Sequence, residues 1–146
     1  MKISTRGRYG LRVMMELATR NGRGPIYART IAKNQGISDK YIHTLMTGLV
    51  SAGLVRTVRG PGGGYEMTKD PSEITALDVV RVLEGNSAPA ECVSDATCCP
   101  RAERCAARDV WCEVASAMDG VLSSLTLEQL VDRQRRKQEE PVTYDI

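Results

Sequence analysis

The sequence has no phenylalanine and a single tryptophan among its 146 residues. A buried core must therefore be built from aliphatic side chains and methionine. Apolar runs are short, and none approaches the roughly 20 residues that a membrane-spanning helix needs. The first residues, MKISTRGRYG, contain no apolar segment of the kind that a secretory signal carries. We therefore expect a cytoplasmic protein without a membrane partner, folded as one domain or as a small domain with an extension.

Cysteine is missing from most of the chain, because all five cysteines lie between Cys92 and Cys112. In a reducing compartment, clustered cysteines are more often metal ligands or redox centres than structural bridges. Histidine is equally scarce, and His43 is the only one. A lone histidine without nearby partners of its own kind is more typical of a surface contact than of a metal site.

Acidic residues are scarce in the first half of the chain only. Residues 1–70 carry twelve Lys and Arg against four Asp and Glu, whereas residues 71–146 carry eight against fourteen. This asymmetry favours contact of the first half with a polyanion and a different task for the second half. A merely solvated basic surface would give the same totals, so charge alone does not decide between the two.

The basic half has the pattern of a helix-turn-helix. A helix is predicted from Gly7 or Arg8 to about Asn21, with one face formed by Leu11, Met14, Met15 and Ala18. A second helix is predicted over residues 28–35, ended by Gly36, and a third begins after the N-cap Ser38. The apolar face of the third helix comprises Ile42, Leu45, Met46 and Leu49. Its opposite face carries hydrogen-bonding side chains, as a DNA-reading helix requires.

Residues 55–67, VRTVRGPGGGYEM, predict two short strands joined by a glycine-rich tip with arginines at its base. Such a hairpin, here called the wing, can lie close to a phosphate backbone because few side chains hold it away. A helix-turn-helix followed by a wing is a winged-helix DNA-binding fold. The residues expected to contact double-stranded DNA are Ser38, Lys40, Tyr41, His43, Thr44, Arg59, Gly60, Pro61, Gly62, Gly63 and Tyr65.

The acidic half is predicted to be helical as well. One helix lies between its cap Thr75 and Gly85, a long one follows from about Arg108 to Ser124, and a last one runs over residues 127–138. Apolar residues of the long helix have the 3, 4, 3, 4 spacing of a coiled-coil seam. They are Trp111, Val114, Met118, Val121 and Leu125. We expect them to form a homodimer, since two DNA half-sites need two recognition helices. The alternative is a stripe that faces the protein's own core.

Four segments resemble one family: MKISTRGRYGLR, SDKYIHTLMTGLVSAGLV, VRGPGGGY, and the cysteine stretch followed by RDVW. Over residues 1 to about 130 the chain is similar to the IscR/NsrR/CymR family of bacterial winged-helix regulators. The resemblance implies a homodimeric transcription factor rather than an enzyme. Many members carry an iron–sulfur cluster between the wing and the dimerisation helix, but clusterless members exist, so the resemblance leaves the cofactor open.

Soft thiolates on one loop suit an iron–sulfur cluster. Cluster-binding members of the family space three loop cysteines by five or six residues, and Cys92, Cys99 and Cys105 match this pattern, with Cys98 a close alternative to Cys99. In the family a fourth ligand stands where this chain has Arg108 or Arg8, and arginine does not ligate iron. The remaining candidates are the spare neighbouring cysteine, Cys112, Glu91, Asp95, Asp109 and an external small ligand.

We therefore predict a mostly α fold with a small β-wing. Residues 1–70 are the winged helix-turn-helix, 71–90 a connecting helix and linker, 91–107 the cluster-binding loop, 108–138 the dimerisation helices and 139–146 a flexible tail. The predicted function is a homodimeric, operator-specific transcriptional repressor that responds to a [2Fe–2S] or [4Fe–4S] cluster, with iron–sulfur assembly proteins as possible cluster donors. The main alternative is a clusterless regulator that uses the same cysteines as a thiol–disulfide switch.

Three further interpretations fit less well. The cysteine gaps are wider than the tight pairs of a structural zinc site. Inert thiols do not explain why all five cysteines are clustered. An iron–sulfur enzyme or electron carrier would have no use for a recognition helix and a wing.

Overall fold

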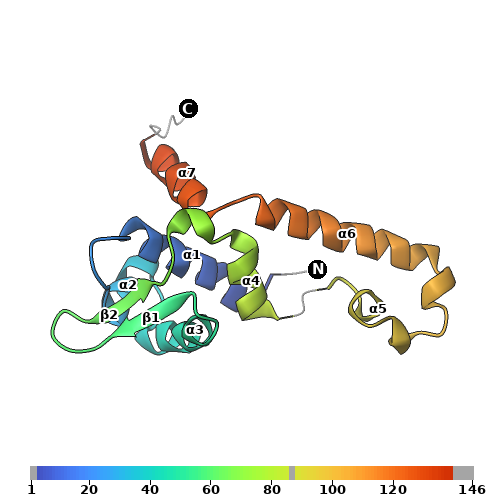
Figure 1. The fold of residues 1–146 in the computed structure, drawn as a ribbon, viewed down its shortest axis with the longest axis horizontal. Helices are drawn as coiled ribbons and strands as arrows, with labels where there is room; N and C mark the ends of the chain where they lie inside the picture. Colours follow the sequence, from blue (N-terminus) through green and yellow to red (C-terminus); the bar gives the residue numbers. More distant parts are fainter. Residues whose placement is uncertain (1–2, 86–87, 140–146) are drawn as a thin grey trace, which may run out of the picture.

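The computed structural model describes residues 3–85 and 88–139, which are mostly helical with one small sheet (Figure 1). The elements in chain order are α1 (Thr5–Thr19), α2 (Ala28–Gln35), α3 (Asp39–Ser51), β1 (Val55–Val58), β2 (Gly64–Met67), α4 (Ala76–Glu84), α5 (Glu91–Ser94), α6 (Ala106–Ser123) and α7 (Leu127–Glu139). Short 3-10 turns are η1 (Pro71–Glu73), η2 (Ala96–Cys98) and η3 (Ala102–Arg104). Within these residues no helix has the length and apolar character that crossing a membrane requires.

The first helix differs from its sequence-based prediction in its bounds and its buried face. It begins at Thr5 because the Ser4 hydroxyl caps it, accepting hydrogen bonds from the first-turn amides. Met14 and Ala18 of the predicted face are buried, together with Val13 and Leu17, whereas Leu11 and Met15 are half-buried. The buried face lies against α4, which packs on the side of α1 that carries Gly7 and Gly10. A periodicity of apolar residues does not detect glycines on a packed face.

The helix-turn-helix and the wing form as predicted. Gly36 ends α2 in the left-handed region (φ 66°), and Ser38 caps α3 by accepting from the Tyr41 amide. Strands β1 and β2 pair antiparallel, with Val55 opposite Met67. The core beneath them is aliphatic with methionine, as the absence of phenylalanine requires. Its largest fully buried side chains are Met14, Ile31, Ile42, Leu45, Met46, Leu49, Ile74 and Leu127.

The second half of the chain leaves this body and returns to it. From the end of α4 the chain reaches α5 and the two following turns, and α6 then runs back above α5 as a long projecting helix (Figure 1). No residue of α6 is fully buried. The capping box at Thr126 and Gln129 starts α7, which packs against α1. In the predicted tail, Glu139 is the last residue of α7, and residues 140–146 lie outside the described residues.

Candidate functional site

The outward face of α3 presents the side chains expected to meet DNA. Lys40, His43 and Thr44 are exposed near the start of the helix. The Thr44 hydroxyl donates to the Lys40 carbonyl oxygen (3.1 Å), which leaves its lone pairs free to accept from a base amino group. Tyr41 is half-buried, and its ring meets the Tyr9 ring edge-on at 6.1 Å. Tyr41 therefore joins α3 to α1 more than it faces outward.

His43 joins the recognition helix to the wing. Its Nδ1 lies 3.0 Å from the Tyr65 hydroxyl, and its Nε2 lies 3.6 Å from a carboxylate oxygen of Asp39. Desolvation and the negative charge of Asp39 raise the pKa of Tyr65, so its phenol stays protonated and can donate to Nδ1. Both ring nitrogens thus have partners within the protein, which the sequence pattern of an outward row does not indicate.

The wing is basic at its tip and neutralised at its base. Arg56 pairs with Glu66 across the two strands (2.8 Å), whereas Arg59 is exposed and has no ionic partner among the described residues. The tip is compact, because a Cβ at Gly63 would lie 2.3 Å from the Val58 carbonyl oxygen. The turn is closed by a hydrogen bond from the Gly63 amide to the Gly60 carbonyl oxygen (3.0 Å). Arg59 is therefore the wing cation that is available to a phosphate.

A further contact to the wing was not predicted from the sequence. Tyr27, which precedes α2, accepts a hydrogen bond from the Gly62 amide at 2.7 Å. The preceding residue, Ile26, pairs with Tyr65 as an isolated antiparallel bridge. The apolar pair at 26–27, preceded by Pro25, is too short to suggest a strand on its own.

Four of the five cysteines lie in or directly beside three neighbouring elements, and Cys112 lies within α6. Cys92 is in α5, Cys98 ends η2 with Cys99 directly after it, and Cys105 precedes α6. All five cysteines are free thiols, Cys98 being exposed and the others half-buried. The donor set fits an iron–sulfur cluster in its chemistry, since thiolates on a loop are its usual ligands. However, over residues 3–85 and 88–139 no three Cys, His, Asp or Glu side chains are arranged to hold a metal ion.

Two features distinguish residues near the predicted ligands. Desolvation and the negative charge of Glu91, with a contribution from neighbouring thiols, raise the pKa of Cys98. A raised pKa lowers the thiolate fraction of Cys98. Arg108 donates from Nε to the Cys92 carbonyl oxygen (2.7 Å). The residue in the family's fourth-ligand position thus holds the loop to α6 by a hydrogen bond.

The predicted dimerisation stripe of α6 is only partly exposed. Trp111 and Val121 are 41% and 62% exposed, and Val110, which the spacing does not include, is 51% exposed. Val114, Met118 and Leu125 are half-buried. Met118 lines a hollow shared with α4 and α5 of the same chain. The exposed apolar surface of α6 is therefore offset from the predicted seam. Seven-residue spacing alone does not distinguish contacts within a chain from contacts between chains.

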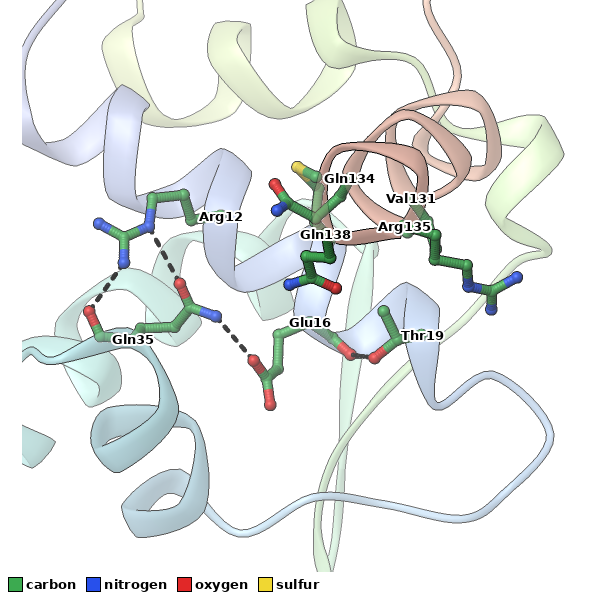
Figure 2. A pocket seen from close by; sticks show the side chains of 9 residues that line it. Arg12, Glu16, Thr19, Gln35, Val131, Gln134, Arg135 and Gln138 are labelled. Carbon is green, nitrogen blue, oxygen red and sulfur yellow. Dashed lines mark hydrogen bonds between the residues drawn. The ribbon is translucent and has the colours of Figure 1, made fainter. Parts of the chain in front are cut away.

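A hollow of about 340 Å³ lies between α1, α2 and α7 (Figure 2). Arg12 donates from Nε and Nη2 to the side chain and carbonyl oxygen of Gln35 (3.0 and 2.9 Å). Gln35 in turn donates to Glu16 (2.6 Å). Figure 2 shows Arg135 extending away from this chain of bonds. Because these polar groups bond to one another, the hollow is a joint between helices, and we assign it no ligand.

Residues 3–133 match the family model Rrf2, described as "Iron-dependent Transcriptional regulator". The HTH-type transcriptional regulator CymR of Bacillus subtilis (strain 168) is 42% identical over 144 residues, which cover 99% of each chain. The structure of CymR, the global cysteine regulator of B. subtilis, has a TM-score of 0.76 at 41% identity, covering 91% of this chain and 98% of that one.

Two further structures are similar over most of the chain. IscR of T. potens has a TM-score of 0.78 at 33% identity, covering 99% of this chain and 95% of that one. The oxidized form of CymR from Staphylococcus aureus has a TM-score of 0.71 at 39% identity, covering 90% and 96%.

Proposed function

Because the chain belongs to the Rrf2 family of transcriptional regulators, we propose that two copies bind one DNA operator and repress transcription from it. The observation that carries this proposal is the exposed row on α3 beside a wing whose Arg59 has no ionic partner in the described chain. The start of α3 supplies base-reading groups, and Arg59 with the wing backbone supplies phosphate contacts. The exposed apolar residues of α6, Val110, Trp111 and Val121, support the dimer.

The DNA contacts are tested with a duplex that the wild-type protein selects from a random library. Arg59→Ala should weaken binding. It should also reduce the magnitude of the slope of the logarithm of the association constant against the logarithm of salt concentration by about 1, because one phosphate contact is lost. Arg56→Ala is the matched control, since Arg56 is already paired with Glu66 across the hairpin. Equal slopes for wild type and Arg59→Ala would contradict the proposed role of the wing.

For the sensor, we propose that Cys92, Cys99 and Cys105 hold an iron–sulfur cluster. When bound, such a cluster supplies one-electron redox chemistry and sensitivity to iron supply and oxidants. The chain's own contribution would be three thiolates, from α5, from the segment after η2 and from the residue before α6, which the described structure does not hold in ligating positions. Arg108 already fixes the main chain at Cys92 to α6. Ordering of the loop would therefore act on the position of α6, and through the dimer on the spacing of the two α3 helices.

The cluster is tested by anaerobic purification, with iron and acid-labile sulfide measured together with the visible spectrum. We expect matched iron and sulfide in the wild type and the loss of both in the variant with Cys92, Cys99 and Cys105 changed to Ala. Cys112→Ala is the comparison variant, because Cys112 lies within α6 and is itself a fourth-ligand candidate: iron and sulfide that persist in this variant exclude that role. Colourless wild-type protein from iron-replete cells would refute the cluster and leave the DNA contacts standing.

A thiol–disulfide switch is the second candidate. It is supported by the free thiols of the loop and by similarity to CymR, one structure of which is an oxidized form. With peroxide as oxidant, two thiols would form one disulfide and the peroxide would be reduced to two waters. This candidate predicts that peroxide changes DNA affinity in protein that contains no iron, and that dithiothreitol reverses the change. A response that requires bound iron would exclude it.

A further inference from the structure

Tyr27 lies outside both the recognition helix and the wing, yet it contacts the wing tip directly. Its hydroxyl accepts a hydrogen bond from the Gly62 amide at 2.7 Å. Its side chain is 47% exposed, so burial does not explain its position. The contact spans 35 residues of sequence and joins the segment before α2 to the tip of the hairpin.

The position of Tyr27 is fixed by the main chain on either side of it. The Ile26 amide donates to the Tyr65 carbonyl oxygen (2.9 Å), and the Tyr65 amide donates to the Ile26 carbonyl oxygen (2.8 Å). This pairing is close enough that a Cβ at Gly64 would lie 2.2 Å from the Ile26 carbonyl oxygen. Residue 27 is also the N-cap position of α2. The tyrosine is therefore held between a strand-like pair and a helix, and its hydroxyl is directed at the tip.

The wing tip is the part of the hairpin with the most conformational freedom to lose when it becomes ordered. Gly60 and Gly62 adopt positive φ values of 91° and 75°, and Pro61 lies between them. Glycines lose more conformational freedom on ordering than other residues. If the tip becomes ordered only when DNA binds, that cost reduces the affinity, and a contact that orders it beforehand increases the affinity.

We propose that Tyr27 is a positioning residue for DNA binding: its hydroxyl holds the Gly62 amide, so that the wing tip and Arg59 meet the phosphate backbone already ordered. This proposal rests on the proposed function. Tyr27 need not touch DNA itself, and its effect passes through the wing. It assigns a role to a residue outside the two elements that carry the expected DNA contacts.

The test is Tyr27→Phe, which removes one oxygen atom and keeps the ring. The dissociation constant for the duplex selected by the wild type should rise about three- to tenfold, the loss expected for one hydrogen bond. Hydrogen exchange of the Gly62 amide should become faster, with the helices still protected. Thr68→Val is the matched control, because the Thr68 hydroxyl donates to the Gly53 carbonyl oxygen at the base of the same hairpin (2.5 Å). The control should leave the affinity and the exchange of Gly62 near the wild-type values.

A double-mutant cycle separates positioning from a general structural role. If Tyr27 acts through the phosphate contact of Arg59, Tyr27→Phe should weaken binding much less in the Arg59→Ala background than in the wild type. Equal effects in the two backgrounds would overturn the proposal, and so would wild-type affinity of Tyr27→Phe. If the wild-type protein selects no duplex from the library, the proposed function itself fails, whatever the exchange of the Gly62 amide.

Discussion

Neutralising Glu84 should loosen the joint between α1 and α4. One carboxylate oxygen of Glu84, the last residue of α4, accepts from the Ser4 amide (3.1 Å), the Ser4 hydroxyl (2.5 Å) and the Gly7 amide (2.9 Å). A carboxylate at a helix N-terminus also interacts favourably with the helix dipole. Glu84→Gln keeps an acceptor oxygen of similar shape but removes the charge that strengthens all three hydrogen bonds.

The expected cost is moderate, because the site is partly open to water. Charge-assisted hydrogen bonds contribute about 1.5–3 kcal/mol and neutral ones about 0.5–1.5 kcal/mol, and solvent screening reduces the difference. We expect Glu84→Gln to lower the free energy of unfolding by about 1–2 kcal/mol, which corresponds to a fall in Tm of about 3–6 °C for a chain of this size.

The same contact predicts how this loss depends on pH. The hydrogen bond from the Ser4 hydroxyl, followed by the amides of Ser4 and Gly7 and the charge of Arg6, lowers the pKa of Glu84 against an opposing effect of desolvation. A carboxyl with a lowered pKa in the folded state stabilises the fold above its unfolded pKa, about 4.5, and loses this contribution as the pH falls through the folded value. The difference between wild type and Glu84→Gln should therefore be largest near neutral pH and shrink below about pH 4.5.

Thermal unfolding followed by circular dichroism, from pH 7 down to pH 3, measures both quantities. Glu113→Gln is the control, because Glu113 is exposed on α6 and has no hydrogen bond or ion pair in the described chain. It should unfold like the wild type at every pH. A Glu84→Gln difference that stays constant down to pH 3 would show that the charge is not what stabilises this joint.

Three further substitutions test the core, the wing and the dimer. Leu45→Ala removes a fully buried side chain of α3 and should lower the free energy of unfolding in urea by about 2–5 kcal/mol; a loss below 1 kcal/mol would contradict its place in the core. Gly64→Ala would set a Cβ against the main chain of Ile26, so amide exchange of Tyr65 should increase and DNA affinity should fall, and unchanged exchange would refute the close approach. Val121→Glu places a charge on the most exposed large apolar side chain of α6 and should give monomers in sedimentation with unchanged helix content, whereas a persisting dimer would place the interface elsewhere.

Much of the fold was predictable because local chemistry determines it. Ser38 and Thr75 cap helices with their own hydroxyls, and Gly36 ends α2 with a positive φ. The resemblance drawn from four short segments is confirmed by the match to the Rrf2 family and by relatives that are transcriptional regulators rather than enzymes. These features depend on a few neighbouring residues, which a single sequence displays in full.

Contacts between distant segments were not predictable in the same way. The spacing of residues in α3 predicted that His43 faces outward, but its hydrogen-bond partner, Tyr65, lies on strand β2 of the wing. The pairing of Ile26 with Tyr65 of β2 places Tyr27 within hydrogen-bond distance of Gly62. No periodic sequence pattern predicts that pairing. Glu84 is an ordinary residue for the end of a helix. Its hydrogen bonds to Ser4 depend on how α4 packs against α1. Each of these contacts needs the packed structure before it can be named.

Arg108 shows how the cysteine loop differs from the rest of the molecule. A guanidinium does not ligate iron, yet here it joins the carbonyl oxygen of Cys92 to α6, so a hydrogen bond attaches this end of the loop to the helix. The thiols of Cys99 and Cys105 have no such attachment to each other in the described residues. Binding of a ligand, or formation of a disulfide, would therefore change mainly the segment between η2 and the start of α6. That segment leads directly into the helix whose exposed apolar residues are proposed to set the distance between two DNA-reading helices.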